Sequence, residues 1–114
     1  MIARLIHENA VRLNAQPKAP PTPTLSTFAI PMADGARYAA VTVTWSPVRK
    51  DIDYLVRWRR TTDSNYTYER TRTSPHVIKL IETGKVILVG LAAQLRQNGA
   101  TGEFGTDASI TTAT

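Results

Sequence analysis

The sequence predicts an all-β protein, an antiparallel β-sandwich of about seven strands. Apolar and polar residues alternate along several short runs, which is the pattern of strands with one buried face. Clusters of Gly, Pro, Asn, Asp and Ser separate the runs, as turns do. The chain has 114 residues, 42% of them hydrophobic, which is enough for one domain with its own core.

The predicted sandwich runs from Thr24 to Thr114, and its alternation is clearest in the first half. Tyr38 to Pro47 alternates apolar residues with Thr, Ser and Ala, and Pro47 ends the run. Asp53 to Thr61 repeats the pattern. Trp45 is expected to fill the core between the sheets, opposite Tyr54, Val56 and Trp58.

The second half continues with shorter runs between turn signals. Further strands are predicted at Tyr66 to Thr73, His76 to Leu80, Lys85 to Gln94 and Asp107 to Thr114. The turns between them are predicted at 62–65, Ser74-Pro75, 82–84 and 97–99.

Two segments precede the sandwich. The leader, 1–16, has an apolar stripe at helical spacing and is predicted to be a short amphipathic helix. Such a helix would dock on a partner or a neighbouring subunit; the alternative is a frayed terminus or the stump of a preceding domain. The linker, 17–23, contains four prolines and is predicted to be an extended spacer, with an SH3-type ligand as the alternative.

The sequence lacks the residues that several classes of function require. The chain has no cysteine, and its two histidines, His7 and His76, fall in different segments, so neither a metal site nor a cofactor site is predicted. Asp51 and Asp53 lie in a basic turn, where charge pairing explains them better than acid–base catalysis. No apolar run approaches the ~20 residues of a membrane span. We therefore expect neither an enzyme nor membrane insertion.

A basic surface is the one concentrated polar feature. The net charge is +5, which suits an acidic protein or an anionic glycan but is also ordinary for a soluble domain. Nucleic acid is not an expected partner, because acids dilute the charge. The candidate binding residues lie on two neighbouring strands: Arg57, Arg59, Tyr68, Arg70 and Arg72. The alternative is a plain solvated sheet face, and Glu69 would point inward or lie at an edge.

The run from Val86 to Ala93 is apolar on both sides. An isolated sandwich should have one wet face, so the outer side of this strand is predicted to be covered by the leader or another subunit. The predicted interface residues are Ile87, Val89 and Leu91.

The order of several motifs identifies a family. The chain reads Pro20-Pro21-Thr22-Pro23 before the first strand, a strand ending in Trp45-Ser46-Pro47, then Tyr54-Leu55-Val56-Arg57-Trp58. Leu80, Gly84, an apolar strand and Asn98-Gly99 follow. This order resembles a fibronectin type III domain, an immunoglobulin-like sandwich, most like those of phage tail-tip and host-specificity proteins. The family's corner tyrosine is replaced here by Val86 or Ile87.

The resemblance implies a non-catalytic structural or interaction module of a phage tail tip or fibre. Its role would be spacing, packing or host attachment, its place the virion tail, and its partners other protein subunits. The alternative is a carbohydrate-binding or adhesion module of a secreted bacterial protein, outside the cell or on its surface. In that case Tyr68 and the arginines would contact an anionic glycan.

Overall fold

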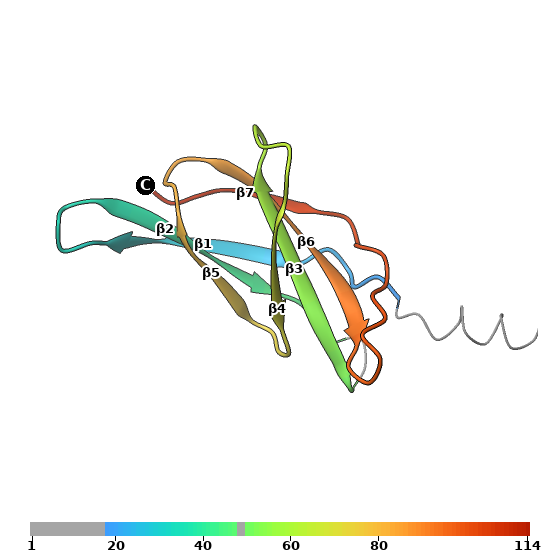
Figure 1. The fold of residues 1–114 in the computed structure, drawn as a ribbon. Helices are drawn as coiled ribbons and strands as arrows, with labels where there is room; N and C mark the ends of the chain where they lie inside the picture. The colour runs from blue at the N-terminus through green and yellow to red at the C-terminus, as the bar shows by residue number, and fades with distance from the viewer. Residues whose placement is uncertain (1–17, 48–49) are drawn as a thin grey trace, which may run out of the picture.

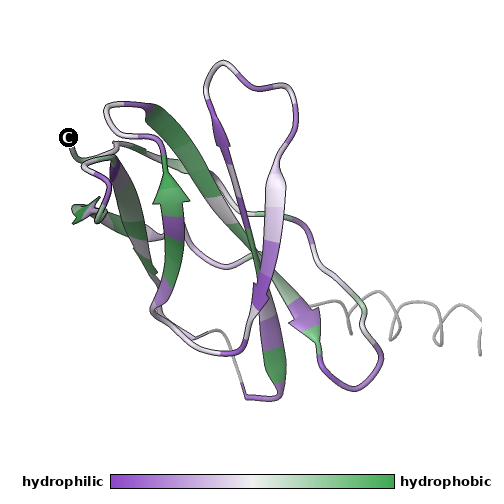
Figure 2. Ribbon diagram, turned by 60° about the vertical axis from the view of Figure 1, so that its left-hand side comes forward, coloured by the Kyte–Doolittle hydropathy of each residue, from purple (hydrophilic) through white to green (hydrophobic). Residues whose placement is uncertain are grey.

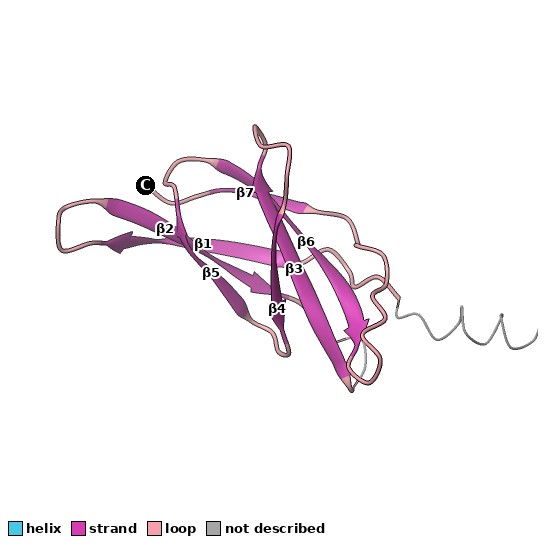
Figure 3. Ribbon diagram, viewed as in Figure 1, coloured by secondary structure: helices cyan, strands magenta, loops and turns pink. Residues whose placement is uncertain are grey.

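The part of the chain that the structure describes forms seven β-strands in two antiparallel sheets that pack face to face (Figures 1 and 3). The computed structural model describes residues 18–47 and 50–114, and the predicted leader helix lies outside them. The strands are β1 Thr24–Pro31, β2 Arg37–Thr44, β3 Ile52–Arg60, β4 Thr67–Thr71, β5 His76–Ile81, β6 Val86–Leu95 and β7 Ala108–Thr111. No helix in these two ranges is long and apolar enough to cross a membrane.

The strand order confirms the predicted sandwich. One sheet has the order β1-β2-β5 and the other the order β4-β3-β6-β7. The paired strands of each sheet run antiparallel, and the long β3–β6 pair runs in register from Ile52↔Leu95 to Arg60↔Ile87. In the three-stranded sheet the β1–β2 hairpin extends well past β5 (Figure 1).

The core lies between the inner faces of the sheets. Trp45 is only 6% exposed, and its ring centroid lies 5.1 Å from that of Tyr54, tilted by 60°. Val56 is fully buried beside them. Trp58 packs against this core only in part, because it lies near the open side of the sandwich. The predicted core is therefore confirmed for Trp45, Tyr54 and Val56, and Trp58 forms its margin.

The prediction that Ile87, Val89 and Leu91 form an interface was wrong. All three belong to the inner face of β6 and are at most 1% exposed. Figure 2 shows the hydrophobic colour along most of this strand. They are apolar because they fill the core, so no partner is needed to cover them.

The opposite face of β6 is covered by the chain itself. The segment between β6 and β7 runs back along the edge of β6: Gly102 N–H donates to Ala93 O at 2.9 Å and Gly105 N–H to Leu91 O at 2.9 Å. Side chains lie over the face itself, because a Cβ at Gly90 would overlap Asp107 Oδ1 and lie 3.1 Å from Arg57 Nε. Ala92 is fully buried, and Val86, at the other end of the strand, remains 43% exposed. The outer face of β6 near Gly90 is therefore covered by side chains of the same chain, Asp107 and Arg57, and needs no subunit there.

A threonine holds the turn where the family pattern has its corner tyrosine. The buried Thr112 hydroxyl donates to Glu82 O at 2.6 Å and accepts the Lys85 N–H at 2.9 Å. Main-chain bonds join Gly84 N–H and Lys85 O to the same residue. The β5–β6 turn is thus fixed from the end of β7.

The proline-rich stretch lies against the sandwich rather than apart from it. Pro20 and Pro23 are buried. A Cβ at Gly105 would overlap the carbonyl oxygen of Pro20, so the two backbones touch. The segment before β1 is therefore packed beside the loop that leads into β7.

Candidate functional site

The outer face of the four-stranded sheet carries the predicted basic residues. The β3–β4 register pairs Arg57 with Tyr68 and Leu55 with Arg70. The same register places Glu69 opposite Val56, on the inner side. Arg57 and Arg59 of β3 and the even-numbered residues of β4 therefore share one outward face, as the alternation predicted.

Arg57 lies at the centre of this face between two aromatic rings. Its guanidinium carbon is 4.3 Å from the ring centroid of Tyr66 and 4.3 Å from that of Phe104. Asp107 accepts from its Nε at 3.2 Å and from the Tyr66 hydroxyl at 2.5 Å. Stacking, cation–π attraction and a half-buried ion pair together fix the arginine. We call Arg57, Tyr66, Tyr68, Phe104 and Asp107 the Arg57 cluster.

Tyr68 is the exposed member of the Arg57 cluster. Its ring is tilted against Phe104 at 5.9 Å and against Tyr66 at 6.3 Å between centroids. The side chain is nevertheless 57% exposed. An aromatic ring that is held by its neighbours and open to solvent offers a pre-ordered contact at low entropic cost.

Arg59 serves the β3–β4 turn. Its guanidinium donates to the carbonyls of Arg60, Thr61 and Asp63, the last at 2.9 Å. The neighbouring Arg60 side chain donates to both Asp63 carboxylate oxygens, and this bond lowers the pKa of Asp63 below its ordinary value. Arg59 is thus largely engaged within the chain, although it also lies 5.2 Å from the Tyr66 centroid.

Arg70 and Arg72 supply exposed charge toward the other end of the face. Arg70 is exposed on β4. Arg72 is 71% exposed and its Nε lies 3.7 Å from Asp53 Oδ1, which also accepts from Arg96 Nε at 3.1 Å. Asp53 is buried beneath the two guanidinium groups. The acids of this face, Asp53 and Asp107, therefore lie under the cations, and the outward charge is positive.

The structure brings some predicted residues together and separates others. Arg57 and Tyr68 meet in one cluster, Arg70 lies beside it, and Arg59 and Arg72 lie toward opposite ends. Sequence reasoning missed Tyr66, Phe104 and Asp107. Tyr66 continues the alternation of Tyr68 and Arg70, so the sequence pattern could have placed it on this face. Phe104 and Asp107 come from an irregular segment, which has no such pattern.

Glu69 joins the edges of the two sheets. Its Oε2 accepts the Trp58 indole N–H at 3.1 Å, and its Oε1 lies 2.8 Å from His76 Nε2. Because β4 and β5 belong to different sheets, this contact closes the open side of the sandwich. His76 is accordingly a structural partner of Glu69 in this structure.

The described residues contain no group of three or more His, Asp or Glu side chains that could hold a metal ion. No family model matches the sequence, and no curated protein matches it significantly. Solved structures do match. A fibronectin type III domain of human fibronectin type III domain containing protein 3 superposes with a TM-score of 0.66 at 14% identity, over 87% of this chain and 88% of that one.

The fold is that of a fibronectin type III domain.

Two other neighbours agree. A structure described as a myokine gives a TM-score of 0.64 at 12% identity, over 87% of this chain and 100% of that one. A fibronectin type III domain of human collagen XX gives 0.57 at 20% identity, over 81% of this chain and 91% of that one. The similarity concerns the fibronectin type III fold, and nothing in these comparisons links the chain to phage tail proteins.

Proposed function

We propose that this fibronectin type III domain is a non-catalytic interaction module. Its binding surface is the outer face of the four-stranded sheet, and its partner is a protein subunit that presents acidic side chains. The observation that carries the proposal is the Arg57 cluster, in which an exposed tyrosine is held rigidly beside exposed arginines. Aromatic and arginine side chains are the residue types that dominate protein interfaces.

The charge arrangement favours an acidic partner. Arg70 and Arg72 are exposed, while the nearby carboxylates of Asp53 and Asp107 are shielded. An approaching carboxylate would therefore meet guanidinium groups first, and Arg presents a planar fork that fits a carboxylate with two parallel bonds. We also propose that the module works within a larger protein assembly, such as the phage tail tip or fibre expected from the sequence.

An anionic glycan is the second candidate, and Tyr68 is the observation that favours it. Its ring is open to solvent and flanked by cations, which suits a sugar face with a charged substituent. A protein partner ranks first because the candidate contacts are spread along β3, β4 and the residues after β4, as in an extended contact surface.

The test compares two variants of the proposed surface with a control that is charge-matched to one of them. Binding to an immobilised poly-glutamate peptide and to heparin is measured by surface plasmon resonance at two salt concentrations. Arg70→Gln is expected to weaken poly-glutamate binding about three- to tenfold, because one charge-assisted contact is lost, and Tyr68→Ala about as much.

The control is Lys79→Gln, which removes the same charge from an exposed position of β5 on the other sheet. It should leave binding within about twofold of the parent. Equal losses for Arg70→Gln and Lys79→Gln would show that only net charge matters and would overturn the proposed surface. Heparin binding that depends on Tyr68, without poly-glutamate binding, would replace the protein partner by a glycan.

A further inference from the structure

A hollow lies at one end of the sandwich, where β2 leaves the core and β3 enters it. Its volume is about 330 Å³, at the small end of the range for ligand sites. Its apolar wall is made by Trp45, Pro47, Ile52 and Tyr54. This is a different surface from the Arg57 cluster, whose members do not line it.

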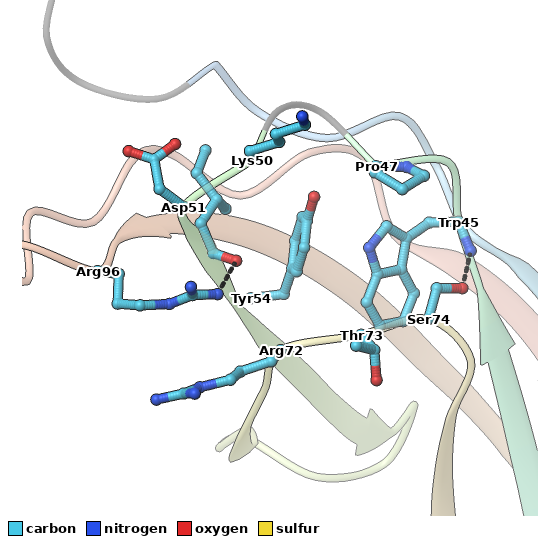
Figure 4. Close-up of a pocket in the computed structure, with 10 residues that line it drawn as sticks. Trp45, Pro47, Lys50, Asp51, Tyr54, Arg72, Thr73, Ser74 and Arg96 are labelled. Carbon is cyan, nitrogen blue, oxygen red and sulfur yellow. Dashed lines mark hydrogen bonds between the residues drawn. The ribbon is translucent and has the colours of Figure 1, made fainter.

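Cations form the polar part of the wall. Lys50, Arg72 and Arg96 line the hollow, together with the single acid Asp51. Figure 4 shows Arg72 and Arg96 on one side of Tyr54 and Trp45 on the other. Arg96 is engaged with Asp53 and with Ile52 O, at 3.1 and 3.4 Å. Arg72 makes only the 3.7 Å contact with Asp53 among the described residues, so its terminal nitrogens remain available.

A residue of the wall of the hollow also has a donor without an acceptor. Trp45 Nε1 is the one buried side-chain nitrogen or oxygen in the described ranges that has no hydrogen-bond partner. Figure 4 shows it on the edge of the indole that faces Tyr54, and the main-chain N–H of Trp45 is already bonded to Ser74 Oγ at 2.9 Å. A buried N–H that lacks an acceptor is costly, and such groups in native proteins call for an explanation.

We propose that the hollow binds a carboxylate carried by an apolar or aromatic group. The apolar part would lie against Trp45 and Tyr54, the carboxylate would accept from Arg72, and a small shift of the indole or of Tyr54 would let Nε1 donate to the ligand. Apart from the Asp51 carboxylate and the Tyr54, Thr73 and Ser74 hydroxyls, the polar side-chain groups of the wall are cations and the Trp45 N–H donor, so an acceptor ligand is complementary and a cationic one is disfavoured.

The two tryptophans give a direct assay. The ¹⁵N-labelled domain has two indole N–H groups: that of Trp45 in the hollow and that of Trp58, which is bonded to Glu69. Titration with 3-phenylpropionate should shift the Trp45 indole resonance in a saturable way and leave that of Trp58 in place. The neutral 3-phenylpropionamide, which has the same ring and no charge, should bind at least about tenfold more weakly.

Variants locate the carboxylate. Arg72→Gln should weaken 3-phenylpropionate binding about tenfold, because it removes the guanidinium with available N–H groups. Arg70→Gln is the matched control, since Arg70 is an exposed arginine two residues away that does not line the hollow. It should leave the affinity unchanged although it weakens poly-glutamate binding, so the two sites can fail separately.

Three results would overturn the proposal. These are no saturable shift of the Trp45 indole, equal affinity for the acid and the amide, or equal losses for Arg72→Gln and Arg70→Gln. Each variant's backbone spectrum shows whether it is folded, so a loss of binding cannot be confused with unfolding.

Discussion

Gly90 sets how closely Asp107 can approach β3. It pairs with Arg57 in the β3–β6 register, and a Cβ there would overlap Asp107 Oδ1 and lie 3.1 Å from Arg57 Nε. Only a hydrogen at this position leaves room for the carboxylate to reach the guanidinium. The geometry of the Arg57 cluster thus depends on a residue that has no side chain of its own.

Gly90→Ala should therefore lower the free energy of unfolding by about 1–3 kcal/mol, since it forces apart a half-buried ion pair in a packed site. Urea denaturation measures the loss. In an Asp107→Ala background the same substitution should cost less than about 1 kcal/mol, because the overlap is gone. Equal costs in both backgrounds would mean that Asp107 is not what the methyl group displaces.

Among the strands, Thr112 makes the hydrogen bonds to the turn that the corner tyrosine makes in the family pattern. One hydroxyl satisfies a carbonyl and an N–H of the β5–β6 turn and ties both to the end of β7. Val86 is exposed and apolar, so it could not form this bond even though it lies in the expected place. The fold thus keeps the connection and takes it from a different strand.

Thr112→Val keeps the shape and removes both hydroxyl bonds. We expect it to destabilise the domain by about 1–3 kcal/mol, since a buried N–H and a buried carbonyl each lose a partner. Thr112→Ser should recover most of the loss. Thr111→Val at the exposed neighbouring position of β7 serves as the control in the same urea experiment; a loss as large as that of Thr112→Val would count against the hydroxyl.

The elements themselves were largely predictable. Alternation and turn residues located β2 to β7 within a few residues, because a strand with one buried face carries its period in the sequence. The same reasoning failed for β6, where Ile87 and its neighbours appeared to need an outside partner. Its second face is covered in part by Asp107, which belongs to the irregular segment between β6 and β7, and irregular backbone has no period from which its position can be read. Phe104 escaped notice for the same reason.

At the scale of the whole molecule, stability rests on a core that crosses both sheets. Leu91 lies in it at 1% exposure, while Val86 on the same strand is 43% exposed. Substitutions at these two positions of β6 therefore compare a buried side chain with an exposed one in the same strand. They also test whether Leu91 belongs to the core or to the interface that the sequence suggested.

Leu91→Ala should cost about 2–5 kcal/mol in the free energy of unfolding, because it leaves a cavity. Val86→Ala should cost less than about 1 kcal/mol. Leu91→Lys should unfold the domain, since its charge would have no partner in the core. Circular dichroism and size-exclusion chromatography distinguish the outcomes. A Leu91→Lys domain that stays folded and loses only a partner would support the interface predicted from the sequence.

The stacking of cations over acids on the outer face has a consequence for how far the domain acts. Asp53 and Asp107 offset part of the field of Arg57, Arg72 and Arg96, which lie next to them, so the outward field of this face is weaker than its number of arginines suggests. What remains decays within the ~8 Å Debye length of physiological salt. Such a face steers diffusing molecules only weakly at long range and selects its partner mainly on contact. This suits a partner that is tethered nearby better than one that diffuses freely.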